Sequence, residues 1–231
     1  MMSFNYLEIL VFLFLLGITY YGYNKGLIRL SVTMLALLTS VIALNVVNPN
    51  IRTMLQENTK LNQYVLTTIY DKIGIGEMHE DSSSALGRSE AIDRLNVPVK
   101  VKDVLKANDN RVVYERLGVY TFADYIAGYV TQMMVNAISF LGSFVLVWLV
   151  LGILFKGNKL IAKLPAMKGL NQILGAAAAL LGGLIAVWLV FIVIIVFYST
   201  KIGAALSSTI ESSQFLLFLS RINPIAFFLG M

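Results

Sequence analysis

Long apolar runs separated by short polar breaks dominate the sequence. A helix that crosses the hydrocarbon core of a membrane needs about 20 apolar residues, each rising 1.5 Å. Four windows reach that length, and they are Phe4–Tyr23, Leu27–Val47, Tyr129–Phe155 and Ile173–Tyr198. We interpret the first as a retained span rather than a signal peptide, because no basic residue precedes Lys25 and no small-x-small cleavage site follows. The pattern therefore predicts four transmembrane helices.

The connection between the second and third windows, residues 48–121, has a different pattern. Its first half carries an apolar stripe at helical spacing, formed by Ile51, Met54, Leu55, Leu61, Val65, Ile69 and Ile73. The stretch GIGEMHEDSSSALGR that follows is rich in glycine, serine and charge, which predicts a mobile segment. Two short helices separated at Pro98 and a last amphipathic turn ending at Gly118 complete the connection. We expect residues 48–121 to form a separate helical insertion.

Polar signals also mark the start of the third span and the segment after the fourth. Thr121 and Asp124 form a capping-box pattern, which predicts that Asp124 serves a helix cap. After the fourth span, the apolar run Phe215–Leu219 is too short to cross a membrane. An interfacial helix is expected before it, followed by an apolar tail that returns to the membrane surface. Its apolar face would contain Ile202, Leu206, Thr209 and Ile210.

These elements predict an all-α polytopic membrane protein with four transmembrane helices, an outer helical insertion between helices 2 and 3, and a C-terminal interfacial helix. Residues 1–47 form the first helical hairpin and residues 48–121 the insertion. Residues 122–198 carry the third and fourth transmembrane helices, and residues 199–231 form the interfacial segment.

Composition and charge placement support this class and predict an orientation. Hydrophobic residues make up 58% of the chain and charged residues 13%, where soluble domains carry about 25%. The net charge of +5 sits beside the apolar spans and not in a nucleic-acid-binding patch. Basic residues occupy the short connections 22–28 and 156–172, so the positive-inside rule places both in the cytoplasm. Both termini and residues 48–121 are then expected outside.

The sequence offers few groups for catalysis or metal binding. There is no cysteine, and the single histidine, His79, lies in the segment expected to be mobile with Glu77, Glu80 and Asp81. One mobile segment without a second cluster makes a weak metal site. Neither a Walker A loop nor a Rossmann fingerprint is present. We therefore expect no enzyme activity, no metal, no cofactor and no nucleic-acid partner.

Polar residues inside the spans are sparse. Glu8 lies about one turn inside the first span, where snorkelling to the outer interface is favoured over a proton site. Asn136, Ser139 and Ser143 share one face of the third span. They are expected to make interhelical hydrogen bonds or to form a polar intramembrane face.

Small residues favour close helix packing. Gly22 and Gly26 are four residues apart in the first turn between spans, as are Gly175 and Ala179 in the fourth span. The stretch GAAAALLGG, which contains Gly182 and Gly183, gives that span a smooth face that another helix approaches closely. We read Gly22–Gly26 as the tight tip of a helical hairpin, with Lys25 and Arg29 at the headgroups. A compact bundle or a homo-oligomer fits this pattern.

Two blocks resemble the colicin V production protein (CvpA) family, in particular its longer members from Gram-positive bacteria. GYNKGLIR, Gly22 to Arg29, is similar to the first cytoplasmic turn of the family, and Glu8 stands eighteen positions before Gly26, where the family carries an acid. KLPAMKGLNQILGAAAALLGG resembles the entry to the last span of the family through Leu170, Asn171, Leu174 and Gly175. Departures are Gln172 in place of a basic residue, Ala179 in place of a glycine and glutamate rather than aspartate at position 8.

The resemblance implies a small multi-pass protein of the bacterial plasma or inner membrane, linked to production or export of a peptide toxin and to envelope stress tolerance. Our leading hypothesis is a non-enzymatic accessory or scaffold protein that meets an envelope or secretion partner through residues 48–121. The alternative is a small transporter or channel component acting as a homo-oligomer. A regulator that binds a separate protease is a weaker third interpretation.

Overall fold

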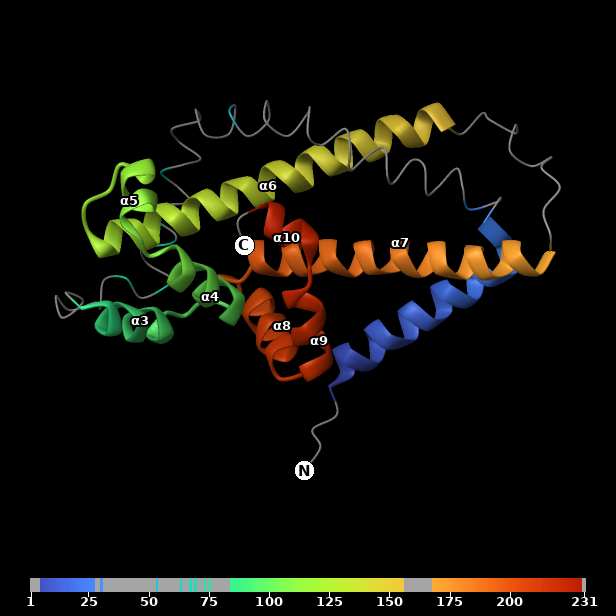
Figure 1. The fold of residues 1–231 in the computed structure, drawn as a ribbon, viewed down its shortest axis with the longest axis horizontal. Coiled ribbons are helices and arrows are strands. Elements are labelled where there is room, and N and C mark those ends of the chain that lie inside the picture. Colours follow the sequence, from blue (N-terminus) through green and yellow to red (C-terminus); the bar gives the residue numbers. More distant parts are fainter. Residues whose placement is uncertain are drawn as a thin grey trace. The chain divides into compact units, whose positions relative to one another are not determined.

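The computed structural model describes residues 5–27, 84–155 and 168–229, together with Leu30, Thr53, Gln63, Thr67, Ile69, Ile73 and Ile75. All regular structure in these residues is helical, and three helices are long and apolar enough to cross a membrane. They are Tyr6–Leu27, α6 (Phe122–Phe155) and α7 (Lys168–Val196), drawn in Figure 1. The expected all-α polytopic membrane class is confirmed. The predicted second span lies outside the described residues apart from Leu27 and Leu30.

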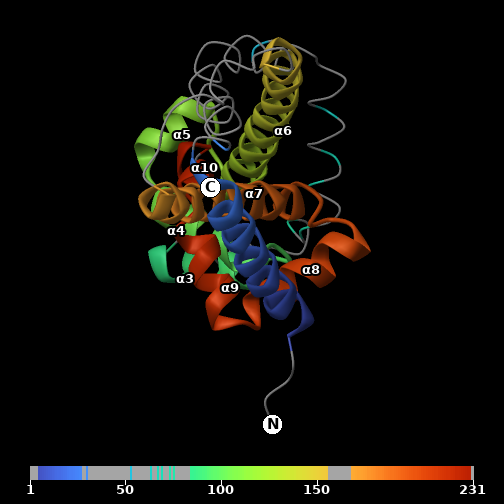
Figure 2. The same cartoon turned by 90° about the vertical axis from the view of Figure 1, so that its right-hand side faces the viewer.

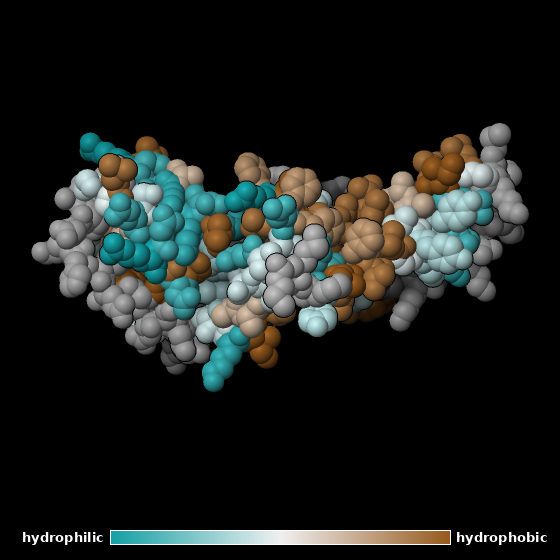
Figure 3. All heavy atoms as spheres, turned by 90° about the horizontal axis from the view of Figure 1, so that it is seen from below, coloured by the Kyte–Doolittle hydropathy of each residue, from teal (hydrophilic) through white to brown (hydrophobic). Residues whose placement is uncertain are grey.

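Shorter helices flank the two long ones in the chain. Before α6 come α3 (Ala85–Arg94), α4 (Val99–Asn108) and α5 (Arg111–Leu117). After α7 come α8 (Lys201–Glu211), α9 (Gln214–Arg221) and α10 (Pro224–Phe228). Figure 3 shows hydrophilic side chains gathered over the helices before α6 and hydrophobic ones over the N-terminal helix.

The chain divides into two compact units. Unit 1 comprises residues 1–51 and 140–191, and unit 2 comprises residues 52–139 and 192–231. Unit 1 contains the helix Tyr6–Leu27 and most of α7, while unit 2 contains the short helices and the N-terminal half of α6. Unit 2 thus joins the insertion and the C-terminal segment, which the sequence pattern treats as separate regions.

In unit 1, the helix Tyr6–Leu27 runs further than the predicted span Phe4–Tyr23. Gly22 is helical and buried, so the predicted tip at Gly22–Gly26 is wrong over most of its length. The reason is that Gly22 serves close helix packing, and one glycine inside a helix costs only about 1 kcal/mol. Gly26 alone has a left-handed backbone, with φ of 72°. The helix begins at an asparagine cap, where the Glu8 amide donates to Asn5 Oδ1 at 3.1 Å.

In unit 2, capping explains where the short helices begin and end. Ser84 caps α3, so residues 85–88 are helical and do not belong to the mobile segment predicted there. Pro98 separates α3 from α4, and Gly118, with φ of 68°, ends α5, both as predicted. Residues 76–83, which include His79, lie outside the described residues. Ile69 and Ile73 of the predicted apolar stripe are buried, and the other five members of that stripe are not described.

Both α6 and α7 start earlier than their apolar windows predicted, and in α6 a polar cap marks the start. The Thr121 hydroxyl accepts from the Asp124 amide at 3.1 Å and donates to its carboxylate at 2.6 Å, so α6 begins at Phe122. This confirms the predicted cap. α7 begins at Lys168, five residues before the predicted start.

The C-terminal segment of unit 2 departs from the predicted interfacial helix. α8 forms as expected, but its buried residues are Gly203, Ser207 and Ile210, while Ile202 is 74% exposed. Ile210 of the predicted apolar face is thus buried together with two small residues of α8, whereas Ile202 of that face is exposed, and the predicted interfacial role stays a prediction. α8 and α9 are bent by 102° and count together as one broken span or a re-entrant pair.

Candidate functional site

The core of unit 2 joins α4, α5 and α6 through a buried tyrosine. Tyr125 of α6 is completely buried, and its hydroxyl donates to the Leu105 carbonyl of α4 at 2.6 Å. Its ring stacks on Tyr114 of α5 at 4.8 Å between ring centroids. Tyr114 in turn donates to Asp109 Oδ1 at 2.9 Å, and Arg88 of α3 binds Asp109 Oδ2 at 2.6 Å. This chain of contacts fixes the insertion on the start of α6.

The carboxylate of Asp109 also governs the ionisation of its partners outside the membrane spans. The hydrogen bond to Asp109 raises the pKa of the Arg88 guanidinium above its already high value. Burial, followed by the hydrogen bond to Asp109, raises the pKa of the Tyr114 hydroxyl. Both groups therefore keep at neutral pH the protonation states that their hydrogen bonds need.

The C-terminal helices are tied to the start of α4. The Val99 amide donates to Glu211 Oε1 at 2.7 Å, and Lys100 Nζ donates to the Ser220 carbonyl at 2.6 Å. A third contact links Asn136 of α6 to the Leu229 carbonyl at 3.3 Å. Figure 2, turned by 90°, gives a second view of α8, α9 and α4 within this unit. Segments more than 100 residues apart in the chain thus form one folded unit.

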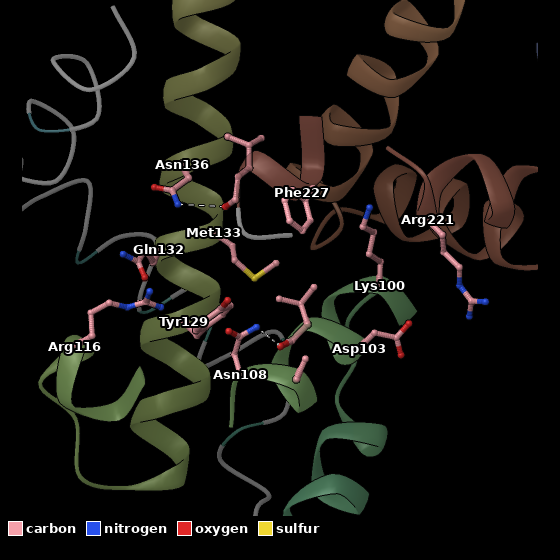
Figure 4. A pocket seen from close by; sticks show the side chains of 13 residues that line it. Lys100, Asp103, Asn108, Arg116, Tyr129, Gln132, Met133, Asn136, Arg221 and Phe227 are labelled. Carbon is pink, nitrogen blue, oxygen red and sulfur yellow. Dashed lines mark hydrogen bonds between the residues drawn. The ribbon is translucent and has the colours of Figure 1, made fainter. Parts of the chain in front are cut away.

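Between these elements lies an open cavity of about 630 Å³. It is formed by α4, α5, α6, α9 and α10, all within unit 2 (Figure 4). Its lining side chains are Lys100, Asp103, Val104, Ala107, Asn108, Arg116, Tyr129, Gln132, Met133, Asn136, Arg221, Phe227 and Leu229. Three of these are basic and one is acidic, so the charged lining carries a net charge of +2.

Lys100 has the most perturbed environment of the three basic groups. Burial lowers the pKa of its ammonium group to about 8 from the usual 10.5. The group keeps its positive charge at neutral pH and holds the Ser220 carbonyl. Arg116 and Arg221 are exposed at the cavity and form no ion pair within the part of the chain that the structure describes.

The predicted polar face of α6 is placed differently residue by residue. Ser139 donates to the Val135 carbonyl of its own helix at 2.6 Å, so this hydroxyl bond is intrahelical. Ser143 is completely buried. Asn136 lines the cavity, and its buried side-chain oxygen has no hydrogen-bond partner among the described residues. The Asn136 amide donates to the Leu229 carbonyl, so this bond joins α6 to the C-terminal segment, as expected for an interhelical contact.

In unit 1, the glycine residues singled out from the sequence meet between the N-terminal helix and α7. A Cβ atom at Gly175 would stand 2.5 Å from the Gly22 carbonyl oxygen and 2.7 Å from the Gly26 Cα. A Cβ atom at Gly22 would collide with Ala179 and Gly175, and one at Gly26 with Asn171. Gly183 faces Ile18 and Leu15 one step further along. The two helices therefore pack antiparallel at backbone contact distance.

The other residues predicted from the family motif and from helix packing make fewer contacts of note. Gly182 is buried and Leu170 is exposed. Lys25 is exposed, with its ammonium 5.6 Å from the centre of the Tyr21 ring. Glu8 is half-buried in the first turn of its helix, and Arg29 lies outside the described residues. An acid in a first turn also interacts favourably with the helix dipole, which the sequence reasoning did not consider.

Comparison with known families gives one match. The family model described as colicin V production protein matches residues 113–224. The chain carries a colicin V production protein domain. This confirms the resemblance found in the sequence, and the long apolar helices make the chain a membrane protein. Comparison with curated proteins and with solved structures gives no match.

The matched region runs from α5 to the start of α10. Of the two blocks that resembled the colicin V production family, the second, Lys163–Gly183, lies inside it, and the first, Gly22–Arg29, lies before it. The cavity was missed by the sequence reasoning, because its basic residues sit on three separate helices at unrelated positions. The basic residue at the end of each amphipathic helix, Arg116 in α5 and Arg221 in α9, is the signal that was available.

Proposed function

We propose that the chain is a non-enzymatic accessory protein of a bacterial cell membrane, and that unit 2 is its working part on the outer surface. It would assist production or export of a peptide toxin and envelope homeostasis, as the family description and the sequence resemblance suggest. The observation that carries the proposal is the pair of hydrogen bonds that join the insertion to the C-terminal segment. A folded unit held by contacts at Val99 and Lys100 is a suitable platform for another protein.

The surface of unit 2 supports a protein partner. Leu86 is 80% exposed and Val112 is 74% exposed, on α3 and α5. Exposed apolar residues on a polar surface are typical anchors of protein contacts. An envelope or secretion protein that binds residues 48–121 would cover these side chains.

Glutamate substitutions at these anchors test the proposal. Leu86→Glu with Val112→Glu adds charge to exposed positions, so folding and membrane insertion should be unchanged. Complementation of a deletion strain, scored as toxin export and survival under envelope stress, should fall at least tenfold, since buried interface charges cost 2 kcal/mol or more, or about thirtyfold in affinity. Arg94→Glu with Arg111→Glu serves as the control on the same two helices.

Two outcomes decide the matter. Full complementation by the Leu86→Glu, Val112→Glu variant would show that these residues are not the partner surface. The same holds if a chain lacking residues 75–117 complements fully while still inserted in the membrane.

A homo-oligomeric transporter is the second candidate, favoured by the bent pair α8–α9, which resembles a re-entrant segment. A transport path would find few charged groups in these spans, because Asp124 is the only acidic or basic residue of α6 and Lys168 the only one of α7. This candidate requires that Glu8→Gln alters flux, or its pH dependence, in liposomes at unchanged protein yield. Unchanged flux would return Glu8 to an interfacial role.

A further inference from the structure

The cavity in unit 2 has more positive charge than its protein partners use. Lys100 Nζ donates one bond, to the Ser220 carbonyl, and an ammonium group has three donors. Arg116 and Arg221 form no ion pair within the described ranges, and Asp103 is the single carboxylate in the lining. A site with a surplus of guanidinium and ammonium donors is complementary to an anion rich in acceptor oxygens.

Neutral donors extend the same preference. Gln132 and Asn108 contribute amide groups and Tyr129 contributes a hydroxyl group to the lining. Figure 4 shows Arg116, Gln132 and Tyr129 on one side of the cavity and Lys100 on the other. A tetrahedral phosphate group presents several acceptor oxygens in different directions, which suits a lining with donors on more than one wall. A planar carboxylate has only two oxygens and would leave more of the hydrogen-bond donors in the cavity unused.

The remaining wall is apolar. Met133 of α6 and Leu229 are buried, and the exposed ring of Phe227 lines the cavity on the C-terminal side. The volume of about 630 Å³ falls within the range of about 300–1,000 Å³ that is usual for sites of drug-sized ligands and well above the size of a lone ion. The ligand that fits this wall joins a phosphate group to an apolar portion.

The position along α6 places the cavity at the level of lipid headgroups. The 34 residues of α6 span about 51 Å, while the hydrocarbon core is about 30 Å thick. Counted back from the end of the helix at Phe155, the roughly 20 residues that cross this core reach to about Asn136, and the one charged residue of α6, Asp124, lies beyond them in the first turn. Tyr129 to Asn136 then lie within about 10 Å outside it, where the headgroup phosphates are.

We propose that this cavity binds a phosphate group, and that the headgroup of an anionic phospholipid is its source. The lipid would place its phosphate at Lys100, with Arg116 and Arg221 as further basic groups of the lining, and its first apolar carbons against Met133 and Phe227. This site goes beyond the accessory role, because it concerns the lipid surroundings of unit 2 and not its protein partner.

Native mass spectrometry of the full chain in detergent tests the site. Phosphatidylglycerol, phosphatidylcholine and inorganic phosphate are titrated separately. We expect phosphatidylglycerol to bind at least tenfold more tightly than phosphatidylcholine. Arg116→Gln with Arg221→Gln should weaken phosphatidylglycerol binding at least tenfold, because each basic group near an anionic lipid contributes to affinity. Both residues are exposed, so the variant should fold normally.

Arg94→Gln with Arg111→Gln is the matched control, since it removes the same charge outside the cavity. Loss of binding in the cavity variant alone supports the lipid site. Tight binding of inorganic phosphate with the same sensitivity, and no preference for the lipid, would support the phosphate site and overturn the lipid source. The proposal would be overturned if the wild type, the cavity variant and the control variant bound phosphatidylglycerol equally, or if none of them bound it. Export assays are not used, so failure of the accessory role leaves this result unaffected.

Discussion

Tyr125 is the residue on which the packing of unit 2 depends most. It is fully buried, donates to the Leu105 carbonyl and stacks on Tyr114. Tyr125→Phe should lower the free energy of unfolding of unit 2 by about 1–3 kcal/mol, because the buried carbonyl loses its partner. Tyr125→Ala should lower it by about 3–5 kcal/mol through the cavity left behind. Thermal unfolding in detergent measures both.

Tyr120→Phe is the control for this comparison, because Tyr120 is 95% exposed and sits five residues away. Its effect should stay within about 0.5 kcal/mol. Equal effects of Tyr125→Phe and Tyr120→Phe would show that the hydrogen bond to Leu105 does not stabilise the unit.

Lys100 gives unit 2 a characteristic pH dependence. Its pKa is about 8 in the folded protein and about 10.5 when exposed, so between these values the unfolded state binds more protons. Stability should therefore rise as pH increases from 8 to 10.5. The charged and titratable groups around it are Asp103 on α4, Arg116 on α5, Tyr129 on α6, Glu211 on α8 and Arg221 on α9.

The measurement is the unfolding temperature at pH 7.5 and pH 9.5. The wild-type increase should shrink in Lys100→Gln, while Lys102→Gln, an exposed lysine bonded to the Asp93 carbonyl, should keep it. An identical increase in all three proteins would assign the effect to other groups.

Single residues were the easiest features to predict when their signal is local. Thr121 and Asp124 are three residues apart and cap α6 as expected, and Gly118 ends α5. Gly22 was misread, because a glycine near a polar break suits both a turn and a close helix contact. Only the facing Gly175, far away in the sequence, decides between the two.

At the scale of elements, the antiparallel contact between the N-terminal helix and α7 rests on missing side chains. Gly175→Ala would place a methyl group against the backbone of Gly22 and Gly26, so the helices must separate. We expect a loss of about 1–3 kcal/mol in stability, as for other overpacked sites. Gly17→Ala is the control, because nothing lies within 4 Å of its Cβ position.

Unfolding temperatures of the two variants in detergent measure this difference. Gly17→Ala should be neutral or stabilising, since alanine favours helix by up to about 1 kcal/mol over glycine. A Gly175→Ala protein as stable as Gly17→Ala would contradict the close contact.

Helix existence was predictable and helix faces were less so. Long apolar windows identified the membrane helices, since length and hydropathy decide that question by themselves. The face of α8 was predicted from apolar residues, and of these Ile210 is buried, but Gly203 and Ser207 are buried with it and were not part of the prediction. Small residues bury easily where two backbones come close, and hydropathy patterns do not register that preference.

At the scale of the whole molecule, the sequence pattern did not show that the insertion and the C-terminal segment belong to one unit. The contacts that join them, at Val99 and Lys100, connect residues more than 100 positions apart. Arg116 and Arg221 reach the same cavity by this route. No local periodicity relates such residues, so only the fold reveals the cavity.

The central proposal is that the short helices of unit 2 lie on the outer side of the membrane, and labelling of single cysteines in intact cells tests it most directly. The chain has no cysteine, so each introduced thiol is unique. Tyr120→Cys lies at an exposed site in unit 2, and Gly169→Cys lies at the exposed start of α7 in the basic connection. A membrane-impermeant maleimide should label Tyr120→Cys in intact cells and Gly169→Cys only after permeabilisation. Labelling of Gly169→Cys but not Tyr120→Cys in intact cells would contradict the account.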